Sequence, residues 1–271
     1  MTHGRADVEA LLDTWSLRPS RALGQNFVAD ANTVRRIVRL AGVGPADPVV
    51  EVGAGLGSLT LALVDTGAQI VAVEVDRHLL APLRAVVEPR GVAVHGGDAT
   101  VLDFAALTAG RPCVVVANLP YNVATPLVLR LLETQPVVRR LFVMVQREVG
   151  ERWVAAPGDA AYGGVSLRVS YFADAHLAGR VPATVFLPRP RVESVLVALE
   201  RRAAVRIDPA RVSEEDLFDV VRRAFAHRRK MLRRSLADWS DPAVFDRAGV
   251  DPTARPEQLG LEEFARLASA R

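Results

Sequence analysis

The sequence has little of several residue types, and each shortage excludes a class of protein. It contains one cysteine, Cys113, among 271 residues, which excludes an internal disulfide. Cys113 begins the apolar run Cys-Val-Val-Val, where we expect a small buried side chain without a chemical role. The five histidines are scattered and lack the spacing of a metal site. We therefore predict no metal.

Long apolar runs are also missing. Half of the residues are hydrophobic, yet runs such as residues 59–64 are far shorter than the roughly 20 residues of a membrane-spanning helix. The first residues mix Arg5, Asp7 and Glu9 with leucines and lack the continuous apolar stretch of a signal peptide. We expect a cytoplasmic protein that contacts no membrane and acts as a monomer.

Lysine is almost absent, because Lys230 is the only one and every other basic side chain apart from histidine is arginine. The net charge is only +3 at pH 7. Between residues 201 and 240, however, eleven Arg or Lys stand against six Asp or Glu, an excess that suits a polyanion. A solvated helix face has the same composition, so charge alone leaves nucleic-acid binding open.

What the sequence does have is alternation. Short runs rich in β-branched residues alternate with amphipathic segments, which is typical of a parallel sheet connected by helices. The predicted strands are residues 49–52, 70–75, 92–95, 114–117 and 141–145. The predicted connecting helices include residues 58–64, 77–87 and 125–133. Right-handed crossovers predict a doubly wound α/β sheet with ligands at the carboxyl ends of the strands. Residues 181–199, with several prolines, predict an edge hairpin.

Beyond about residue 200 the strand pattern ends, and a helical pattern replaces it. Ser213 precedes three acidic residues, as a helix N-cap does. The apolar residues that then share one helical stripe are Leu217, Val221, Phe225, Leu232 and Leu236. The chain is long enough for a large and a small domain. We predict that residues 1–200 bind a cofactor and that residues 201–271 form a small helical domain.

The loop after the first predicted strand, residues 53–57, has the pattern G-x-G-x-G and leads directly into a helix. Glycines there let the backbone approach a ligand and point amide groups at it. Glu74 ends the second strand, where a carboxylate can accept both hydrogens of a ribose diol. Together they predict an adenosine-containing cofactor, and they leave open whether it is a nicotinamide or an adenosyl compound.

Two further strand ends carry polar residues. Asp98, followed by Ala99, ends the third strand, where an acceptor either binds an adenine amino group or closes a turn. The fourth strand leads into Asn118-Leu119-Pro120-Tyr121. Its amide oxygen, exposed backbone carbonyls and flat ring suit an aromatic amine that stacks on the tyrosine. A proline turn with a packed tyrosine is the alternative.

These motifs, in this order, resemble the KsgA family of small-subunit ribosomal RNA adenine dimethyltransferases over about residues 21–236. The matching segments are residues 23–27, 51–57, 74–76, 97–99, 118–122, 146–149, 161–163, 186–194 and 225–234. Val28, Val123 and Glu193 replace the common Leu, Ile and Asp without removing a functional group.

The resemblance implies a Rossmann-like class I methyltransferase sheet with S-adenosylmethionine as cofactor. It implies methylation of two adjacent adenines near the 3′ end of 16S ribosomal RNA to dimethyladenosine, with the small ribosomal subunit or its precursor as partner, and thus a role in ribosome biogenesis.

The resemblance also implies residue roles. The expected contacts of S-adenosylmethionine are Asn26, Val28, Gly53, Gly55, Glu74, Asp98, Ala99 and Asn118, with the glutamate on the ribose and Asp98 on the adenine. The expected catalytic residues are Asn118, Leu119, Pro120 and Tyr121. The expected contacts of RNA phosphates are Arg222, Arg223, Arg229, Lys230, Arg233 and Arg234.

Three alternatives are less favoured. Macrolide-resistance methyltransferases modify an adenine of 23S ribosomal RNA with a similar loop, but Leu119 and residues 188–194 favour the small-subunit enzyme. A non-catalytic role in ribosome assembly or transcription is disfavoured by the intact polar residues Glu74, Asp98 and Asn118. A nicotinamide oxidoreductase is disfavoured because its loop is G-x-G-x-x-G.

Overall fold

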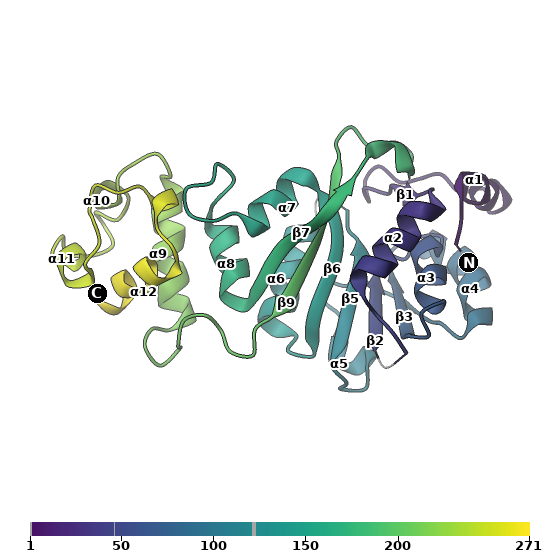
Figure 1. The fold of residues 1–271 in the computed structure, drawn as a ribbon, viewed down its shortest axis with the longest axis horizontal. Helices are drawn as coiled ribbons and strands as arrows, with labels where there is room; N and C mark the ends of the chain where they lie inside the picture. The colour runs from purple at the N-terminus through teal and green to yellow at the C-terminus, as the bar shows by residue number, and fades with distance from the viewer. Residues whose placement is uncertain (1, 46, 121–122) are drawn as a thin grey trace. The chain divides into compact units, whose positions relative to one another are not determined.

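The structure, a computed structural model, describes residues 2–45, 47–120 and 123–271 and consists of two compact units (Figure 1). Unit 1 comprises Met1–Gly150 and His176–Arg201, and unit 2 comprises Glu151–Ala175 and Arg202–Arg271. This division differs from the predicted domains in grouping residues 151–175 with the C-terminal helices. Two contacts explain the grouping: Tyr171 packs edge-on against Phe218 at 5.4 Å between ring centroids, and the Tyr162 hydroxyl donates to the Leu259 carbonyl at 2.8 Å.

The described part of unit 1 is built on a seven-stranded sheet of order β4-β3-β2-β5-β6-β9-β7. Its parallel strands are β2 (Pro48–Val52), β3 (Gln69–Glu74), β4 (Ala93–Gly96), β5 (Cys113–Asn118) and β6 (Val138–Gln146). At one side β9 (Ser194–Arg201) pairs antiparallel with β6, and β7 (Ala173–Val181) forms the edge. The predicted Rossmann-like sheet is confirmed.

Helices cover the central strands on both faces. Strands that are buried on both faces have continuous hydrophobic runs, and the central strands are apolar for this reason. Val49 and Val50 of β2 are fully buried. Cys113 is buried as predicted, and burial raises the pKa of its thiol to about 11. The thiol is therefore protonated and takes part only in packing.

Helices connect the strands and lie against the sheet (Figure 1). In unit 1 they are α1 (Arg5–Thr14), α2 (Ala31–Ala41), α3 (Ser58–Val64), α4 (Arg77–Val87), η1 (Glu88–Arg90), α5 (Phe104–Leu107), α6 (Ala124–Thr134) and η2 (Ala183–Val185). The helix α7 (Arg147–Val154) begins in unit 1 and ends in unit 2. Asp30 caps α2 by accepting the Thr33 amide at 2.7 Å. The apolar face of α2, with Val34, Ile37 and Val38, packs into the core that covers the sheet.

A separate two-stranded sheet joins β1 (Phe27–Val28) to β8 (Phe186–Leu187). The predicted edge hairpin over residues 181–199 is confirmed only in part, because β9 lies beside β7 at the edge of the sheet but β8 leaves this sheet and pairs with β1. The prolines in this segment explain the difference, since Pro182, Pro188 and Pro190 have no N–H for a continuous ladder. The interruption brings β8 to the N-terminal segment of the chain.

Unit 2 is mostly helical, with α8 (Gly164–Phe172), α9 (Glu214–Ala226), α10 (Leu232–Ser235), α11 (Val244–Ala248), η3 (Pro256–Gln258) and α12 (Leu261–Ser269). Ser213 caps α9 as predicted, accepting the Asp216 amide at 3.0 Å. The predicted continuous helical stripe to Leu236 is wrong, because α9 ends at Ala226. The Leu232 amide donates to the Ala254 carbonyl at 2.8 Å instead of continuing the helix.

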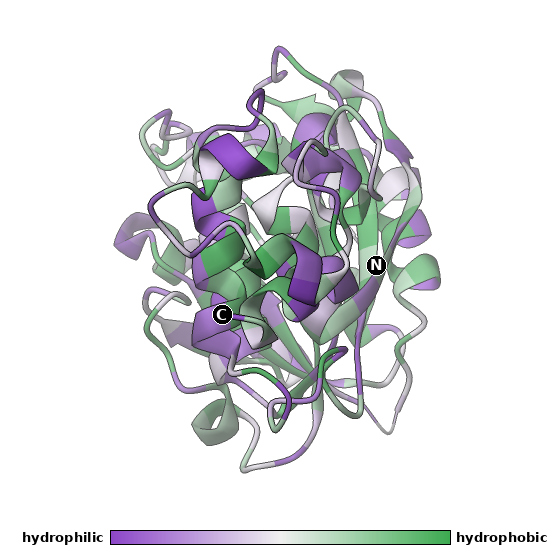
Figure 2. Cartoon of the chain, turned by 90° about the vertical axis from the view of Figure 1, so that its left-hand side faces the viewer, coloured by the Kyte–Doolittle hydropathy of each residue, from purple (hydrophilic) through white to green (hydrophobic). Residues whose placement is uncertain are grey.

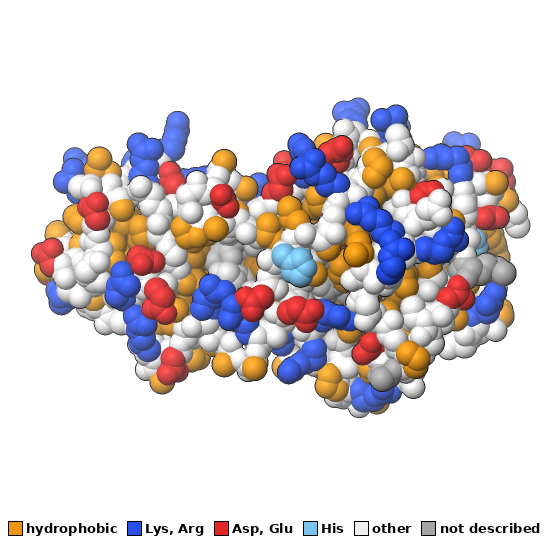
Figure 3. All heavy atoms as spheres, in the orientation of Figure 1, with side chains coloured by type: hydrophobic (Ala, Val, Ile, Leu, Met, Phe, Trp, Pro, Cys, Tyr) orange, Lys and Arg blue, Asp and Glu red, His pale blue; other side chains and the backbone are white. Residues whose placement is uncertain are grey.

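Hydropathy follows this architecture, with hydrophobic colour along the strands and hydrophilic colour in many loops (Figure 2). Charged side chains of both signs cover the face seen in Figure 3. In the described residues, no helix combines the length and the apolar character needed to cross a bilayer.

Candidate active site

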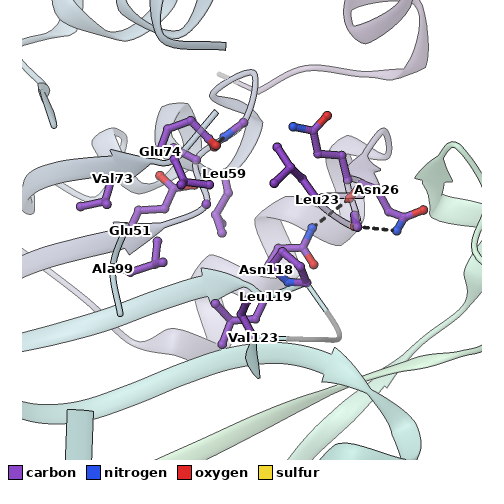
Figure 4. A pocket seen from close by; sticks show the side chains of 18 of the residues that line it. Leu23, Asn26, Glu51, Leu59, Val73, Glu74, Ala99, Asn118, Leu119 and Val123 are labelled. Carbon is purple, nitrogen blue, oxygen red and sulfur yellow. Dashed lines mark hydrogen bonds between the residues drawn. The ribbon is translucent and has the colours of Figure 1, made fainter. Parts of the chain in front are cut away.

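A cavity of about 260 Å³ opens at the carboxyl ends of the parallel strands in unit 1. Glu51, Glu74 and Asn118 surround it from three neighbouring strands (Figure 4). The predicted site residues that line this cavity are Asn26, Val28, Gly53, Gly55, Glu74, Asp98, Ala99, Asn118, Leu119 and Pro120. Tyr121, the remaining predicted catalytic residue, lies outside the described residues. Segments far apart in the sequence thus meet at one edge of the sheet.

The glycine-rich loop after β2 is shaped by close contacts with its neighbours. Gly55 has φ of 58°, and a Cβ atom there would lie 3.0 Å from the Phe27 ring, so a larger residue would be both strained and crowded. The Gly55 amide donates to Glu74 Oε2 at 2.8 Å. This bond fixes the loop against the end of β3 and leaves its backbone facing the cavity.

Glu74 is the best-anchored acid of the site. Its side chain is 5% exposed, and its second oxygen, Oε1, accepts the Asp76 amide at 2.9 Å. Burial raises the pKa of Glu74, while the backbone amides of Asp76 and Gly55 act in the opposite direction. Each carboxylate oxygen accepts one backbone donor and keeps a further lone pair. The group can therefore accept two more donors, as a ribose diol would require.

Asp98 lies exposed at the rim of the cavity. Its Oδ1 accepts the Thr100 amide at 2.8 Å and the Thr100 hydroxyl at 2.7 Å, which is the turn-forming role considered from the sequence. Its Oδ2 has no partner among the described side chains and backbone groups. Asp98 thus forms the turn and keeps one free acceptor, while binding of an adenine amino group stays a prediction.

Asn118 has a fixed orientation. Its Nδ2 donates to the Asn26 carbonyl at 3.0 Å (Figure 4), and Asn26 in turn donates from its own Nδ2 to the Gly24 carbonyl at 3.0 Å. Since the amide nitrogen is occupied, the Asn118 Oδ1 is left as an acceptor without a partner in the described chain. The side chain therefore offers an oxygen to a ligand.

The backbone after Asn118 adds a second acceptor. The Leu119 amide donates to the Met144 carbonyl at 3.0 Å, and the Pro120 carbonyl accepts the Val123 and Ala124 amides at 3.3 and 3.2 Å, at the start of α6. The Leu119 carbonyl accepts no hydrogen bond from any residue that the structure describes. Among the described residues, Asn118 Oδ1 and the Leu119 oxygen are thus two adjacent acceptors that receive no hydrogen bond.

Glu51 is a site residue that the sequence prediction missed. It is 1% exposed, lines the cavity, and has a buried Oε2 without a partner. Burial raises the pKa of Glu51 to about 8, the nearby Thr60 hydroxyl opposes the rise, and the charge of Glu74 adds to it. The signal in the sequence was an acid inside an otherwise apolar strand.

Gln25 was also missed. Its Nε2 donates to Asp76 Oδ2 at 2.7 Å, and its Oε1 accepts the Ser20 amide at 2.7 Å. The side chain therefore ties the segment before β1 to the end of β3. Its position next to Asn26 in the sequence was the available signal.

The predicted RNA-binding residues all lie exposed in unit 2. Arg222 and Arg223 are on α9, and both form ion pairs with Asp219, the second at 2.8 Å. Arg229 and Lys230 follow α9, and α10 carries the last two, Arg233 and Arg234. We call these six residues the C-terminal basic cluster. No ion pair is formed by the last four within the described chain.

No three His, Cys, Asp or Glu side chains gather into a metal-binding group within residues 2–45, 47–120 and 123–271.

The sheet and the polar groups at its strand ends define the class of protein, which is that of RNA methyltransferases. The structure of the 23S rRNA methyltransferase ErmE matches with a TM-score of 0.71 and 25% identity, covering 90% of this chain and 99% of that chain. A dimethyladenosine transferase from Plasmodium falciparum has the same fold, with a TM-score of 0.73 and 22% identity, covering 87% and 94%.

The chain belongs to the ribosomal RNA adenine dimethylase family, whose sequence model matches residues 17–270. A relative from Kineococcus radiotolerans is 49% identical, over 98% of this chain and 90% of its own length. One from Thermobifida fusca is 48% identical, over 98% and 95%. Both are named ribosomal RNA small subunit methyltransferase A.

Membership of this family confirms the predicted S-adenosylmethionine-dependent adenine methyltransferase of ribosomal RNA. It excludes the nicotinamide oxidoreductase and the non-catalytic alternatives. The names of the relatives favour the small-subunit enzyme over the 23S alternative. The roles of individual residues stay predictions that the geometry supports.

Proposed function

We propose that this enzyme methylates the exocyclic amines of two adjacent adenines near the 3′ end of 16S ribosomal RNA, in the small subunit or its precursor. The small-subunit relatives support the choice of RNA. The observation that supports the chemistry is the orientation of Asn118, whose Nδ2 is occupied by the Asn26 carbonyl. We expect a monomer that acts in the cytoplasm, where small subunits are assembled.

The cavity residues fit S-adenosylmethionine. Gly53 and Gly55 give a backbone surface that a ligand can approach, and Glu74 offers acceptors to the ribose hydroxyls. Around them Asn26, Val28 and Ala99 form the wall, and Asp98 presents its free oxygen to the adenine. When bound, S-adenosylmethionine supplies an electrophilic methyl group on a sulfonium.

Glu51 adds the charge that such a ligand needs. Its Oε2 is buried without a partner at the cavity wall, and an unpaired buried carboxylate is costly. S-adenosylmethionine carries positive charge at its sulfonium and its amino group. A cation near Glu51 favours the ionised carboxylate, so its pKa falls when the cofactor binds.

The target amine is a poor nucleophile, because its lone pair is delocalised into the adenine ring. Asn118 Oδ1 and the Leu119 carbonyl each accept one of its two hydrogens, which orients the nitrogen lone pair toward the cavity. Such positioning can contribute about 7 kcal/mol or more to lowering a barrier. No acid is hydrogen-bonded to Asn118 in the described structure, so the residues act by orientation rather than as a general base.

Apolar side chains complete the site. Leu23, Phe27, Leu56, Leu59 and Val123 line the cavity. They exclude water, which strengthens the hydrogen bonds that Asn118 and Leu119 make to the amine. After the first transfer the methylated nitrogen releases one proton to water and keeps one hydrogen, so one acceptor is enough to hold it for the second transfer.

The C-terminal basic cluster fits RNA phosphates. Four of its residues, from Arg229 to Arg234, form no ion pair with a described acid, although the charge of Arg233 contributes to lowering the pKa of the Asp251 carboxyl. Arginine presents several N–H donors in a plane, which matches the oxygens of a phosphate. We propose that this cluster contributes affinity for the RNA backbone and no sequence preference.

The proposed function is tested with labelled S-adenosylmethionine and small subunits from cells that lack this methylation. We expect dimethyladenosine in the small-subunit RNA, at two adjacent positions near its 3′ end, as read by nucleoside analysis and reverse transcription. Labelled adenine in 23S ribosomal RNA, or macrolide resistance in cells that express this chain, would overturn the choice of substrate.

A further inference from the structure

A second basic surface lies in unit 1, on α2 and the end of β7. Helix α2 carries Arg35, Arg36 and Arg39, and no acidic residue occurs between Asp30 and Asp47. Residues 175–192, which include Arg180, are also free of Asp and Glu. Two segments without acids, far apart in the sequence, thus contribute arginines to the same unit.

These two segments are in direct contact. Arg36 Nη1 donates to the Arg180 carbonyl at 2.8 Å, and a Cβ atom on Gly179 would collide with the Arg36 guanidinium. Basic side chains accordingly gather over α2 and the neighbouring end of β7 (Figure 3). We call Arg35, Arg36, Arg39 and Arg180 the α2–β7 basic surface.

The charges of this surface are not neutralised within the described chain. None of its four arginines forms an ion pair with a described acid. Arg35 donates to the amide oxygen of Asn32 at 2.7 Å, and its charge is only the last of the causes that lower the pKa of Asp30. By contrast, Arg84 on α4 pairs with Glu88 at 2.9 Å. Arg35, Arg39 and Arg180 are exposed.

The surface adjoins the wall of the cavity. Helix α2 begins shortly after β1, whose Phe27 and Val28 line the cavity, and η2 connects β7 to Phe186 of β8, which lines it too. Because β1 and β8 pair with each other, the arginines and the cavity belong to one continuous piece of unit 1. A ligand held on these arginines would have a fixed position relative to the reacting atoms.

We propose that the α2–β7 basic surface binds phosphates of the ribosomal RNA whose adenines enter the cavity. The inference rests on the proposed function and adds a contact region to it. RNA is favoured because arginine without acidic neighbours suits a polyanion, and the planar guanidinium matches a phosphate. Through this surface, unit 1 itself sets the position of the RNA backbone, and the C-terminal basic cluster adds affinity.

Leu40 on α2 and Leu177 on β7 are exposed at 40% and 42%. Exposed apolar side chains would suit contact with a ribosomal protein in place of RNA. The experiment therefore uses protein-free 16S ribosomal RNA as well as whole small subunits. Because protein-free RNA carries no ribosomal protein, its affinity separates the two partners.

The variant R35Q/R39Q/R180Q removes three charges and keeps Arg36, which is bonded to the backbone of β7. The control R84Q/R90Q/R111Q removes the same charge from the α4–β4 side of unit 1. For each protein we would measure the Kd for protein-free 16S RNA at several salt concentrations, the Kd for S-adenosylmethionine, and the thermal midpoint. Methylation of whole small subunits completes the set.

We expect the surface variant to bind RNA about 10- to 100-fold more weakly at about 150 mM salt. The slope of log Kd against log salt should fall by about 2, as for three lost phosphate contacts. The control should stay within about threefold of the wild type, because its arginines contact no phosphate. Binding of S-adenosylmethionine and the thermal midpoint should be unchanged in the surface variant.

Two results would overturn the inference. The first is equal affinity of the wild type and the surface variant for protein-free RNA. If the variant then also methylates whole subunits poorly, the surface contacts a ribosomal protein and not the RNA. Equal weakening in the surface variant and the control would show a general charge effect. A wild-type enzyme that leaves small subunits unmethylated would instead refute the proposed function, while the RNA affinities still decide this inference.

Discussion

The cavity of unit 1 and the C-terminal basic cluster of unit 2 use polar residues in opposite ways. In the cavity, Glu74 and Asn118 have backbone partners at 2.8 to 3.0 Å that fix their remaining acceptors. In the cluster, exposed side chains from Arg222 to Arg234 have either a local ion pair or no described acid. The first arrangement depends on the position of single atoms, whereas the second depends on summed charge.

This difference predicts the size of mutational effects. An oriented hydrogen-bonding group at a reacting centre contributes about 100- to 1,000-fold to a rate. A single exposed charge on a polyanion contact contributes much less, and its contribution changes with salt. Substitutions in the two regions therefore test the comparison directly.

The largest effect is expected for Asn118→Ala. Loss of the Oδ1 acceptor should lower kcat about 1,000-fold, because the amine is no longer oriented, with little change in the thermal midpoint. Single-turnover methyl transfer and a thermal melt measure the two quantities. Gln69→Ala, an exposed amide at the start of β3 and thus at the opposite end of this strand from the cavity, is the matched control and should keep normal activity. A kcat within threefold of the wild type in Asn118→Ala would contradict the proposed mechanism.

The next effect is expected for Glu74→Gln, which replaces one acceptor oxygen by a donor. The amide cannot accept both the backbone donors and a ribose diol, so the Kd for S-adenosylmethionine should rise about 10- to 100-fold, or about 1.4 to 2.7 kcal/mol. Calorimetric titration measures it. Glu88→Gln, an exposed glutamate of η1, is the control. Unchanged affinity in Glu74→Gln would remove this residue from the cofactor site.

A smaller effect concerns pH and Glu51. Its pKa is raised from 4.5 to about 8 in the folded chain, so between these values the folded state holds one more proton than the unfolded state. This contribution to stability is complete below pH 4.5 and is lost as the pH rises through about 8. The free energy of unfolding should fall by about 1 kcal/mol per pH unit near neutrality.

Glu51→Gln removes that proton and should flatten the dependence. Urea unfolding of the cofactor-free protein at about pH 6.5 and 7.5 measures both slopes, and the difference between the proteins should be about 1 kcal/mol. Identical slopes would show that Glu51 is ionised in the folded protein. Glu200→Gln, an exposed glutamate of β9, serves as the control.

The smallest effect is expected for Arg234→Ala in the C-terminal basic cluster. The affinity of this variant for small-subunit RNA should fall about two- to fivefold, and the slope of log Kd against log salt should decrease by about 0.7 to 0.9. Arg222→Ala should have less effect still, because Asp219 already neutralises part of that charge. Filter binding at several salt concentrations compares the two. A loss of 100-fold for either variant would mean that the cluster acts through fixed geometry after all.

The sequence predicted most of the cavity, because each polar residue directly follows an apolar run. A parallel sheet places strand ends at the same edge, so Glu74, Asp98 and Asn118 had to lie near one another once the strands were located. The glycine pattern before α3 identified the loop that forms a further part of the cavity wall. Local sequence patterns were sufficient here because a parallel sheet brings the ends of its successive strands close together.

The rest depended on contacts between distant segments. The pairing of β8 with β1 interrupts the predicted edge hairpin, and α9 ends at Ala226 because the following backbone bonds to residues 252 and 254. The raised pKa of Glu51 follows from its complete burial and from the nearby charge of Glu74, which no pattern of neighbours in the sequence reveals.

The bond from Asn118 to the Asn26 carbonyl has a practical consequence. The part of the chain before the sheet decides which atom of the Asn118 amide is left for a ligand in the cavity. Substitutions around residues 20–26 should therefore appear in genetic screens as methylation-deficient alleles with normal protein levels, although none of them would alter the loop that holds the target base.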